Sequence, residues 1–414
     1  MLLEIELEII KQCLAKPELL KNLFIQKLGY EPIRWGGIGI SNNKVLIEAI
    51  GFPELRFQAF ELIKHKNIKS FSTKEIGLAI IPTGLGCSIG GFGGDANIFA
   101  NLMAEEFDNL IINPNIVNGG AWQNIPSKAL YTEGLAIDLF TKGLIALRPK
   151  KRPDNKIGIV IDSSLSDSAL KRELQVIEAA KLIWGLNILE IQMTESKLDL
   201  NIDILPKGFS SGNIQNPKVL LKAAQQLIDK GAEAIAIITN MSDLDAQNET
   251  NGDLYMNGNS PDPIGGLEAI LSHLITATFL IPAAHAPSFD NLELAPEAEK
   301  LDKRVSPEIA SYSFLPSVLK GLAQAPSLIP IDLIEAGDLN LNNLKAFIAP
   351  ADCWLGESFI NLASHQNISK YAVQNNICGI NLNPELMNFE NINKVNNYFE
   401  LIGYLKAWNL GFSF

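Results

Sequence analysis

Residues 259–287 hold the densest group of side chains that could move protons. The segment contains Glu268 and two of the four histidines, His273 and His285. We interpret His285, which follows an apolar run and precedes a proline, as a loop residue suited to acid/base catalysis near neutral pH. His273 falls inside a predicted helix, where a histidine is more often a core residue. Its spacing from Glu268 does not match the His-Glu-x-x-His pattern of a zinc site, so no metal site is predicted.

The start of that predicted helix is suited to holding an anion. Gly265 and Gly266 open the helix, and the free amides at a helix start attract carboxylate and phosphate groups. Asp262 lies just before the helix and is a candidate general acid or base. We therefore expect Asp262, Gly265, Gly266 and Glu268 to face a ligand.

A second group is a glycine-rich loop that begins at Pro82 and reads Pro-Thr-Gly-Leu-Gly-Cys-Ser-Ile-Gly-Gly-Phe-Gly-Gly-Asp-Ala-Asn. Without a Cβ, the backbone amides of such a loop can approach a ligand, although a turn that needs glycine for its geometry alone is the alternative. The loop lacks the lysine of a nucleotide-phosphate loop and matches the dinucleotide fingerprint only loosely, so neither ATP nor NAD is indicated. The amides would favour a thiolate at Cys87. The candidate ligand-binding residues are Gly84, Gly86, Cys87, Gly90, Gly91, Gly93 and Gly94.

Two polar residues follow this loop at the expected helix start. Asp95 is a candidate catalytic carboxylate, with a simple N-cap role as the alternative. Asn97 is a candidate ligand contact. Both would lie beside any molecule that the loop holds.

Polar side chains also follow the next apolar runs along the chain. Asn113, Asn115 and Asn118 surround a proline after a buried run and are candidate ligand contacts, although an ordinary turn has the same composition. Glu133 precedes a predicted helix, where it is either a general acid/base or a charge that favours the helix start.

Three further candidates follow apolar runs in the second half of the chain. Asp162 and Asn240 are candidate ligand contacts, and Asp243 is a candidate catalytic carboxylate. In open parallel sheets, ligands bind beyond the carboxyl ends of the strands, which is where these residues would lie.

Short apolar runs alternate with helical patterns and predict an α/β fold. The expected sheets are mostly parallel with βαβ crossovers, in two lobes plus a small N-terminal α+β segment. Expected strands include 44–50, 157–161, 234–238, 346–350 and 378–382; expected helices include 1–30, 54–67, 168–184 and 216–230. The expected units are residues 1–70, residues 71–150 with the glycine-rich loop, and residues 151–414, the last two sharing a sheet or a cleft.

Composition limits the classes of partner. The 414 residues are 47% hydrophobic and carry a formal net charge of −12, which disfavours nucleic acid and anionic lipid, and the basic run Arg148–Arg152 is expected to be a solvated connector. The four cysteines show neither metal-site nor disulfide spacing and fit a reducing compartment. The start of the chain does not have the pattern of a signal peptide, and the apolar stretch 267–281 is too short to cross a bilayer. A cytoplasmic protein, able to form a homo-oligomer, is expected.

The glycine-rich loop, the segment Asn113-Pro-Asn-Ile-Val-Asn, the segment Leu130-Tyr-Thr-Glu-Gly and residues 262–287 occur in an order that resembles an uncharacterised family. This is domain of unknown function 3326 of bacteria, cyanobacteria and plastids, and the resemblance spans residues 76–385. It implies a fold and no reaction, and the family often has His where this chain has Asn113. A distant similarity to aspartate/glutamate racemases is weakened because Thr239 stands where those enzymes have a cysteine.

These patterns favour an enzyme that binds a small polar, anionic metabolite that carries a carboxylate or phosphate group. It would use acid/base chemistry without a redox cofactor, as a lyase, isomerase or hydrolase does. The alternative is a non-catalytic metabolite-binding or regulatory protein that uses the same loops.

Overall fold

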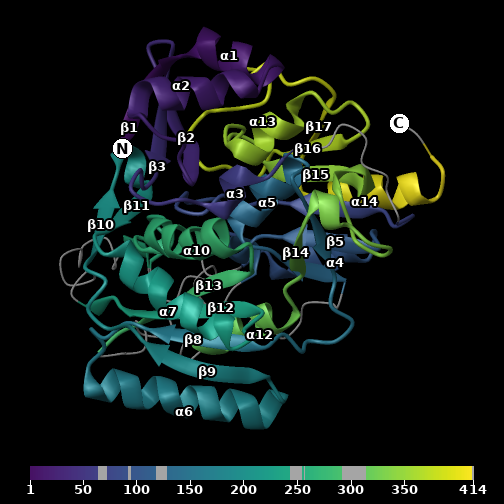
Figure 1. Cartoon of the computed structure of the whole chain (residues 1–414). Helices are drawn as coiled ribbons and strands as arrows, with labels where there is room; N and C mark the ends of the chain where they lie inside the picture. The colour runs from purple at the N-terminus through teal and green to yellow at the C-terminus, as the bar shows by residue number, and fades with distance from the viewer. Residues whose placement is uncertain are drawn as a thin grey trace.

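A computed structural model describes residues 1–63, 72–91, 95–117, 128–242, 254–255, 257–290 and 314–412. These residues form an α/β protein with two parallel sheets and a small N-terminal segment, so the expected fold class is confirmed (Figure 1). None of the described helices is long and apolar enough to span a membrane.

The N-terminal segment is a three-stranded antiparallel sheet with helices packed against it. Its elements are β1 (Leu2–Glu6), α1 (Leu7–Ala15), α2 (Glu18–Leu28), β2 (Arg34–Ser41), β3 (Lys44–Ile50) and α3 (Gln58–Glu61). The strand order is β1-β3-β2. The helix expected from residue 1 is wrong over its first turns, because residues 2–6 pair with β3 along their whole length. The helix expected over 54–67 is limited to α3 within the described residues, because the backbone is extended at Leu62.

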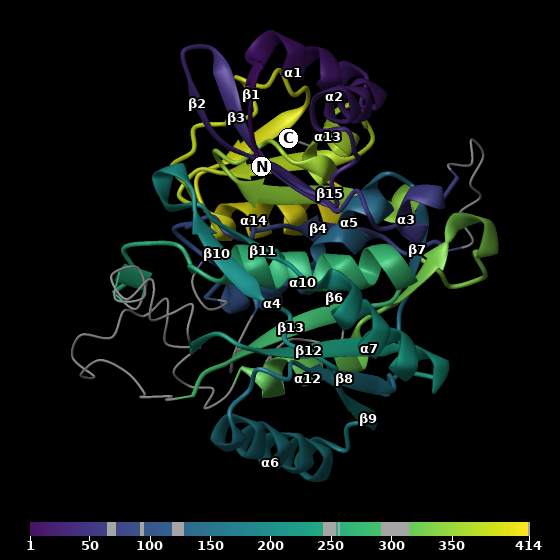
Figure 2. The same ribbon diagram turned by 60° about the vertical axis from the view of Figure 1, so that its left-hand side comes forward.

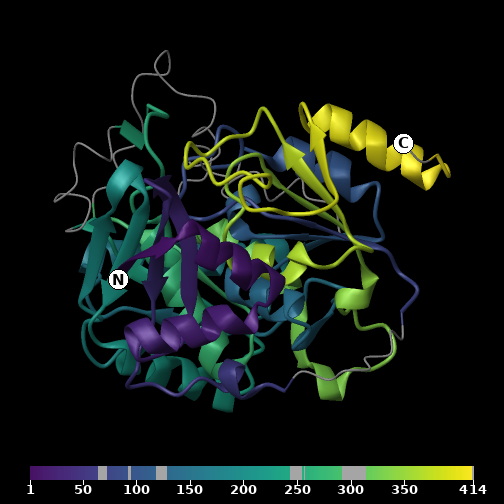
Figure 3. The same cartoon turned by 90° about the horizontal axis from the view of Figure 1, so that it is seen from above.

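The larger sheet has six parallel strands in the order β17-β16-β15-β4-β5-β6. The strands are β4 (Ile76–Ala79), β5 (Asn109–Ile112), β6 (Ala129–Tyr131), β15 (Leu344–Pro350), β16 (Ser369–Val373) and β17 (Ile392–Val395). Its helices are α4 (Asn97–Ala104), α5 (Gly134–Thr141), α13 (Glu357–Ala363) and α14 (Tyr398–Asn409). Every residue of β4 and β5 is buried, which explains their unbroken apolar runs. Residues 344–395 thus complete the sheet that residues 76–131 begin, and Figure 3 shows α14 at the far edge of the molecule from the N-terminus.

The strand expected over 378–382 is absent. Only an isolated bridge joins Leu382 to Cys353 in this stretch. Gly379 and Asn381 have positive φ angles of 73° and 60°, which an extended strand cannot accommodate.

The second sheet has four parallel strands in the order β13-β12-β8-β9. The strands are β8 (Ile157–Ile161), β9 (Ile188–Met193), β12 (Ala234–Asn240) and β13 (Ala283–Ser288), and the helices are α6 (Asp167–Trp184), α7 (Pro217–Asp229), α10 (Gly265–Phe279) and α12 (Leu315–Gln324). His285 therefore lies in a buried strand and not in the loop that the sequence suggested, because the prolines that bound it fall at the strand's ends.

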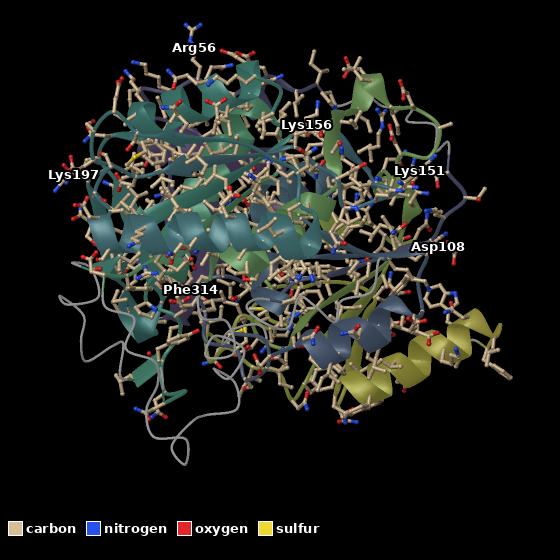
Figure 4. The ribbon with its side chains drawn as sticks, turned by 90° about the horizontal axis from the view of Figure 1, so that it is seen from below. Arg56, Asp108, Lys151, Lys156, Lys197 and Phe314 are labelled. Atoms are coloured by element: carbon tan, nitrogen blue, oxygen red, sulfur yellow. The ribbon has the colours of Figure 1, made fainter. Side chains whose placement is uncertain are left out.

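Smaller elements join the two sheets. Two antiparallel pairs are β7 (Ile145–Arg148) with β14 (Ser327–Pro330), and β10 (Leu200–Ile204) with β11 (Ser210–Ile214). Short 3₁₀ helices span Pro114–Ile116, Pro206–Gly208, Ile331–Leu333 and Leu341–Asn343. The basic run Arg148–Arg152 leads from β7 toward β8; its Lys151 is exposed, as Figure 4 shows, and Arg148 is ion-paired with Asp338 at 2.7 Å.

Helix α10 lies between the two sheets. It contacts β13 and α7 on one side and α5 and β11 on the other. Figure 2 shows it between β4 and β15 above and β12 and β13 below. Side chains of α10 can therefore reach the functional edges of both sheets.

The six-stranded sheet has a topological switch point between β4 and β15. From β4 the chain proceeds to β5 on one side, and from β15 it proceeds to β16 on the other. The connections therefore diverge beyond the carboxyl ends of these two neighbouring strands. In open parallel sheets this divergence leaves a crevice in which ligands bind.

Candidate functional site

A cavity of about 130 Å³ lies at this switch point. Its walls come from β2 and β3 of the N-terminal segment, from the segments that follow β4, β5 and β15, and from α5, α10 and α13. Polar groups converge on it among apolar side chains, as is usual for small-molecule sites. The polar and charged side chains that line it are Arg34, Glu48, Thr83, Asn113, Asp138, His273, Glu357 and Ser358.

Arg34 forms one wall of the cavity and is held from two sides. Its Nε donates to Glu48 Oε2 at 3.1 Å, and its Nη2 donates to the Thr83 carbonyl at 3.1 Å. Glu48 is 1% exposed and also accepts a hydrogen bond from the Ser211 hydroxyl. The guanidinium Nη1 makes no hydrogen bond within the described part of the chain, so it is available to an oxygen atom of a ligand.

His273 forms a second polar wall, and Glu133 lies behind it. The Glu133 carboxylate caps α5 by accepting from the Leu135 and Ala136 amides at 3.1 and 3.2 Å. Its Oε1 also contacts His273 Nδ1, which leaves the other ring nitrogen, Nε2, for a ligand. Gly134 gives the ring room, because a Cβ there would lie 3.0 Å from His273 Cε1. Glu133 thus has both the structural role and a position that orients a cavity-lining histidine.

Asp138 is on α5, one turn beyond the cap. The Ser358 hydroxyl donates to Asp138 Oδ1 at 2.5 Å. Burial and the neighbouring Glu357 raise the pKa of Asp138 to about 7, although Ser358 and His273 act in the opposite direction. Glu357 itself accepts a hydrogen bond from Trp35 Nε1 at 2.5 Å. A carboxyl group with this pKa can give or take a proton at neutral pH.

A second histidine–carboxyl pair lies on the other side of α10. Glu268 Oε1 is 3.0 Å from His285 Nδ1, and Thr239 Oγ1 is 2.8 Å from His285 Nε2. Burial raises the pKa of Glu268 to about 8. Burial also lowers the pKa of His285 to about 3, against the influence of Asp262 and Asp162. Burial thus disfavours the charged form of each partner.

Asp262 and the start of α10 are closely packed. Burial and the nearby Glu268 raise the pKa of Asp262 to about 7, although it accepts from the Ile264 amide at 2.9 Å. The Gly266 amide donates to Ser210 Oγ at 2.9 Å, and the Gly265 amide to the Asp262 carbonyl at 3.4 Å. These two amides already have acceptors within the protein.

The glycine-rich loop packs tightly against its neighbours. A Cβ on Gly84 would lie 2.6 Å from the Ser210 carbonyl, and a Cβ on Gly91 would lie 2.3 Å from the Cys87 amide. Gly86 faces Pro261 at an ordinary contact distance. Cys87 is completely buried, and burial raises the pKa of its thiol, so the thiolate expected from the neighbouring amides is wrong.

Asp95 is hydrogen-bonded to the first half of this loop. Its Oδ1 accepts from the Gly90 amide at 2.5 Å, and Gly90 has a φ of 85°. Asn97 is the first residue of α4 and accepts from Asn101 Nδ2 at 3.0 Å. Neither side chain lines the cavity. Gly93 and Gly94 lie outside the described residues.

The asparagines that follow β5 brace the segment after β4. Asn113 accepts from the Ile81 amide at 3.0 Å and donates to the Ile81 carbonyl at 2.7 Å. Asn115 donates to the Pro82 carbonyl at 2.9 Å. Asn113 also lines the cavity. Asn118 lies outside the described residues.

The described candidates at the edge of the second sheet, Asp162 and Asn240, both bind Ser164. Asp162 accepts from the Ser164 amide and hydroxyl at 3.2 and 2.7 Å, and Asn240 donates to the Ser164 carbonyl at 3.1 Å. Asp243 lies outside the described residues. Within the part of the chain that the structure describes, no three His, Cys, Asp or Glu side chains are arranged to hold a metal ion.

The predicted residues on or beside the cavity fall into two neighbouring groups, whereas Asp95, Asn97, Asp162 and Asn240 belong to neither. Asn113 and His273 line the cavity with Glu133 behind, whereas Asp262, Glu268 and His285 lie around the start of α10. The groups are linked because a Cβ on Gly265 would lie 3.6 Å from Thr83, and because both Glu268 and Glu133 raise the pKa of Tyr131.

Sequence reasoning missed several residues of the cavity wall. These are Arg34, Trp35, Glu48, Asp138, Glu357 and Ser358. Only Asp138 carried a usable signal, because it lies five residues after Glu133 on the same predicted helix. The others come from segments without a recognisable motif.

Comparison with known proteins identifies the relatives of this chain. Residues 76–414 match the family described as "Protein of unknown function (DUF3326)". The chain is also 33% identical over 337 residues to a protein of Synechococcus sp. that is named an uncharacterized lipoprotein; the match covers 80% of this chain and 90% of that protein. No solved structure shows significant similarity. The similarity to aspartate/glutamate racemases finds no support in these comparisons. The resemblance carried by the glycine-rich loop and residues 262–287 is therefore confirmed, and the chain belongs to the DUF3326 family.

Proposed function

We propose that this protein is an enzyme that binds a small polar metabolite with a carboxylate or phosphate group at the switch-point cavity. The reaction is acid/base chemistry of the lyase, isomerase or hydrolase type and calls for no redox cofactor. The observation that carries the proposal is that His273 and Asp138 both line the cavity, with Glu133 in contact with His273 Nδ1. A histidine and a carboxyl group on the wall of one cavity can act as a general base and a general acid.

Each polar group has a distinct part in this proposal. Arg34 Nη1 binds an oxygen of the anionic group, while Glu48 holds the guanidinium in place. His273 Nε2 takes a proton, and Asp138, whose pKa is raised to about 7, returns one. Glu133 is a positioning residue.

Other residues predicted from the sequence lie beside the cavity and do not contact the ligand in this proposal. The Glu268–His285 pair and Asp262 form a second group of titratable side chains beside the same helix. The catalytic roles suggested for Asp95 and Asp243 stay predictions.

The test requires a ligand first. Thermal-shift screening of small carboxylates and phosphates selects binders, and NMR then follows each binder for product. We expect His273→Gln and Asp138→Asn to lower kcat/KM by about 100-fold or more while the selected compound still binds. Matched controls are His365→Gln and the exposed Asp203→Asn, which should change kcat/KM less than twofold.

The outcomes separate the proposal from its alternative. An inflection of kcat/KM near pH 7 that disappears in Asp138→Asn supports the acid/base role, because the pKa of Asp138 is about 7. Unchanged turnover in both cavity variants contradicts it. Saturable binding without product from any selected compound favours a non-catalytic metabolite-binding protein.

A cytoplasmic location belongs to the same proposal. It is supported by the spacing of the four cysteines in the sequence, which fits neither a disulfide framework nor a metal site. The relative named a lipoprotein points the other way. Cys13 is 1% exposed inside α1, which makes it a poor acceptor for a lipid. Cell fractionation with mass spectrometry of the N-terminal peptide decides the matter: a membrane-bound, acylated chain contradicts the proposal.

A further inference from the structure

Three of the four cysteines meet at one place beside the cavity. Cys87 lies in the glycine-rich loop, Cys353 follows β15 and lines the cavity, and Cys378 follows β16. The Sγ atoms of Cys87 and Cys378 are 2.6 Å apart although 291 residues separate them in the chain. Cys353 lies close enough to Cys378 for each thiol to influence the pKa of the other, and its own thiol donates to the Pro350 carbonyl at 3.8 Å. Cys13 lies apart from this cluster, in α1.

Hydrogen bonds hold the two thiol-bearing segments together independently of the sulfur atoms. The Ser88 amide donates to the Ile377 carbonyl at 2.9 Å. The Asn376 side chain accepts from the Ile89 amide and donates to the Ile89 carbonyl, both at 2.9 Å. Cys87 precedes Ser88 and Cys378 follows Ile377, so both cysteines are adjacent in sequence to the Ser88–Ile377 bond. A covalent bond between the two sulfur atoms therefore needs little movement of the backbone.

Asp352 fixes the position of Cys378 from the other side. Its two carboxylate oxygens accept from the Cys378 amide at 2.6 Å and from the Gly379 amide at 2.8 Å. Gly379 has a φ of 73°, which allows the tight turn that presents both amides to one carboxylate. The thiol pair is thus held in a built site.

We propose that Cys87 and Cys378 are a disulfide-forming pair, oxidised by a low-molecular-weight disulfide. The bond ties the glycine-rich loop, whose first residues line the cavity, to the segment that follows β16. A metal site is disfavoured, because no cluster in the described ranges is arranged as metal ligands. This inference does not depend on the proposed function.

The reaction is two successive thiol–disulfide exchanges. Cys378, which is partly exposed, attacks one sulfur of the small disulfide as a thiolate and forms a mixed disulfide, releasing the first small thiolate. Cys87, which is buried, then attacks the Cys378 sulfur and releases the second. The two protein thiols lose their protons to the two released thiolates, and the small disulfide is reduced to two thiols.

Burial sets the rate of this exchange. It raises the pKa of both Cys87 and Cys378, so that little thiolate exists at neutral pH. Oxidation should therefore be slow at pH 7 and should accelerate by about tenfold per pH unit up to pH 9.

The test uses the full chain incubated with glutathione disulfide at pH 7 to 9. Free thiols are then alkylated in denaturant, and proteolytic peptides are identified by mass spectrometry. We expect a peptide pair linked through Cys87 and Cys378, with Cys13 and Cys353 alkylated. Four alkylated cysteines after incubation to equilibrium at pH 9, or a link that joins Cys353 to either partner, overturn the proposal.

Variants assign the steps. Cys13→Ser is the matched control and should retain the link, whereas Cys87→Ser should stop at a glutathione adduct on Cys378. Oxidised Cys13→Ser should melt at least about 5 °C above its reduced form, because the bond closes a very long loop. Equal melting temperatures in the two forms would contradict a bond formed without strain. The peptide map of the unaltered chain decides the question even where a variant fails to fold.

Discussion

The charged residues around the cavity are held in fixed contacts at short range. Arg34 and Glu48 show this most clearly, because the carboxylate is 1% exposed and its oxygens accept from both Arg34 and the Ser211 hydroxyl. A buried charge that loses its partner keeps its desolvation cost and loses its compensation. The pair therefore stabilises the cavity wall only as long as it is complete.

Arg34→Ala should lower the free energy of unfolding by about 3 kcal/mol, because it leaves Glu48 buried and unpaired. Urea denaturation measures the change. The double variant Arg34→Ala with Glu48→Gln should recover part of the loss, since the remaining group is neutral. Lys222→Ala breaks an exposed ion pair with Glu195 and is the control, expected to cost less than about 1 kcal/mol. Equal costs for Arg34→Ala and Lys222→Ala would show that Glu48 does not need its partner.

The sequence predicts some of these residues and not others. Glu133 and Asn113 follow apolar runs directly, so their place at a sheet edge can be expected without a structure. Asp138 lies inside a helix, and its position on the cavity depends on how α13 brings Ser358 against it. Arg34 comes from a separate antiparallel sheet. Contacts of this kind depend on tertiary packing, which local patterns do not encode.

At the scale of elements, the close approach of α10 to β11 depends on glycine. A Cβ on Gly266 would lie 2.0 Å from the Ser210 carbonyl oxygen and 2.6 Å from the Ser211 Cα. Both are backbone atoms, so no side-chain rotation can relieve the clash. Glycine at this position lets the helix that carries Glu268 and His273 lie against the hairpin.

Gly266→Ala should therefore push α10 away from β11 and lower the free energy of unfolding by about 2 kcal/mol or more. The matched control is Gly403→Ala in the middle of α14, where a Cβ meets nothing within 4 Å. That change should stabilise the protein by about 0.5–1 kcal/mol, because alanine favours a helix. Chemical denaturation of both variants checks the pair. A Gly266→Ala protein as stable as the unaltered chain would show that the helix can shift without cost.

The elements themselves were mostly predictable. The runs 157–161 and 234–238 are strands because apolar residues, rich in isoleucine, cover both faces of a buried parallel sheet. The run 378–382 has similar apolar content but is not a strand, since positive φ angles at Gly379 and Asn381 break it. Such backbone angles are set by contacts with Asp352 that the sequence does not reveal.

At the scale of the whole molecule, the chain closes on itself to build the candidate site. The six-stranded sheet takes three strands from residues 76–131 and three from residues 344–395, with the second sheet inserted between them. The cavity lies at the junction of these distant parts. Composition and periodicity identify the strands but not this order, because parallel runs of similar sequence can pair in many ways.

One consequence of this closure is that three partly buried carboxyl groups have raised pKa values. The values are about 7 for Asp138, about 7 for Asp262 and about 8 for Glu268. The unfolded chain releases these protons near pH 4, whereas the folded protein keeps them until pH 7 to 8. The folded state thus binds more protons in this range, and its stability must fall as the pH rises. His285 acts in the opposite sense, but only below its ordinary pKa of 6.5.

Between pH 6.5 and 8.5 the carboxyl groups therefore dominate the pH dependence of stability over His285. The free energy of unfolding should fall by roughly 2–3 kcal/mol across this range. Urea denaturation at the two pH values measures the change. The free energy of unfolding of Asp138→Asn should fall less over the same range, because the amide has no proton to release. That of Asp203→Asn should fall as much as in the unaltered chain. A stability that stays level or rises from pH 6.5 to 8.5 would mean that these carboxyl groups are already ionised in the fold, and that Asp138 cannot supply a proton at neutral pH.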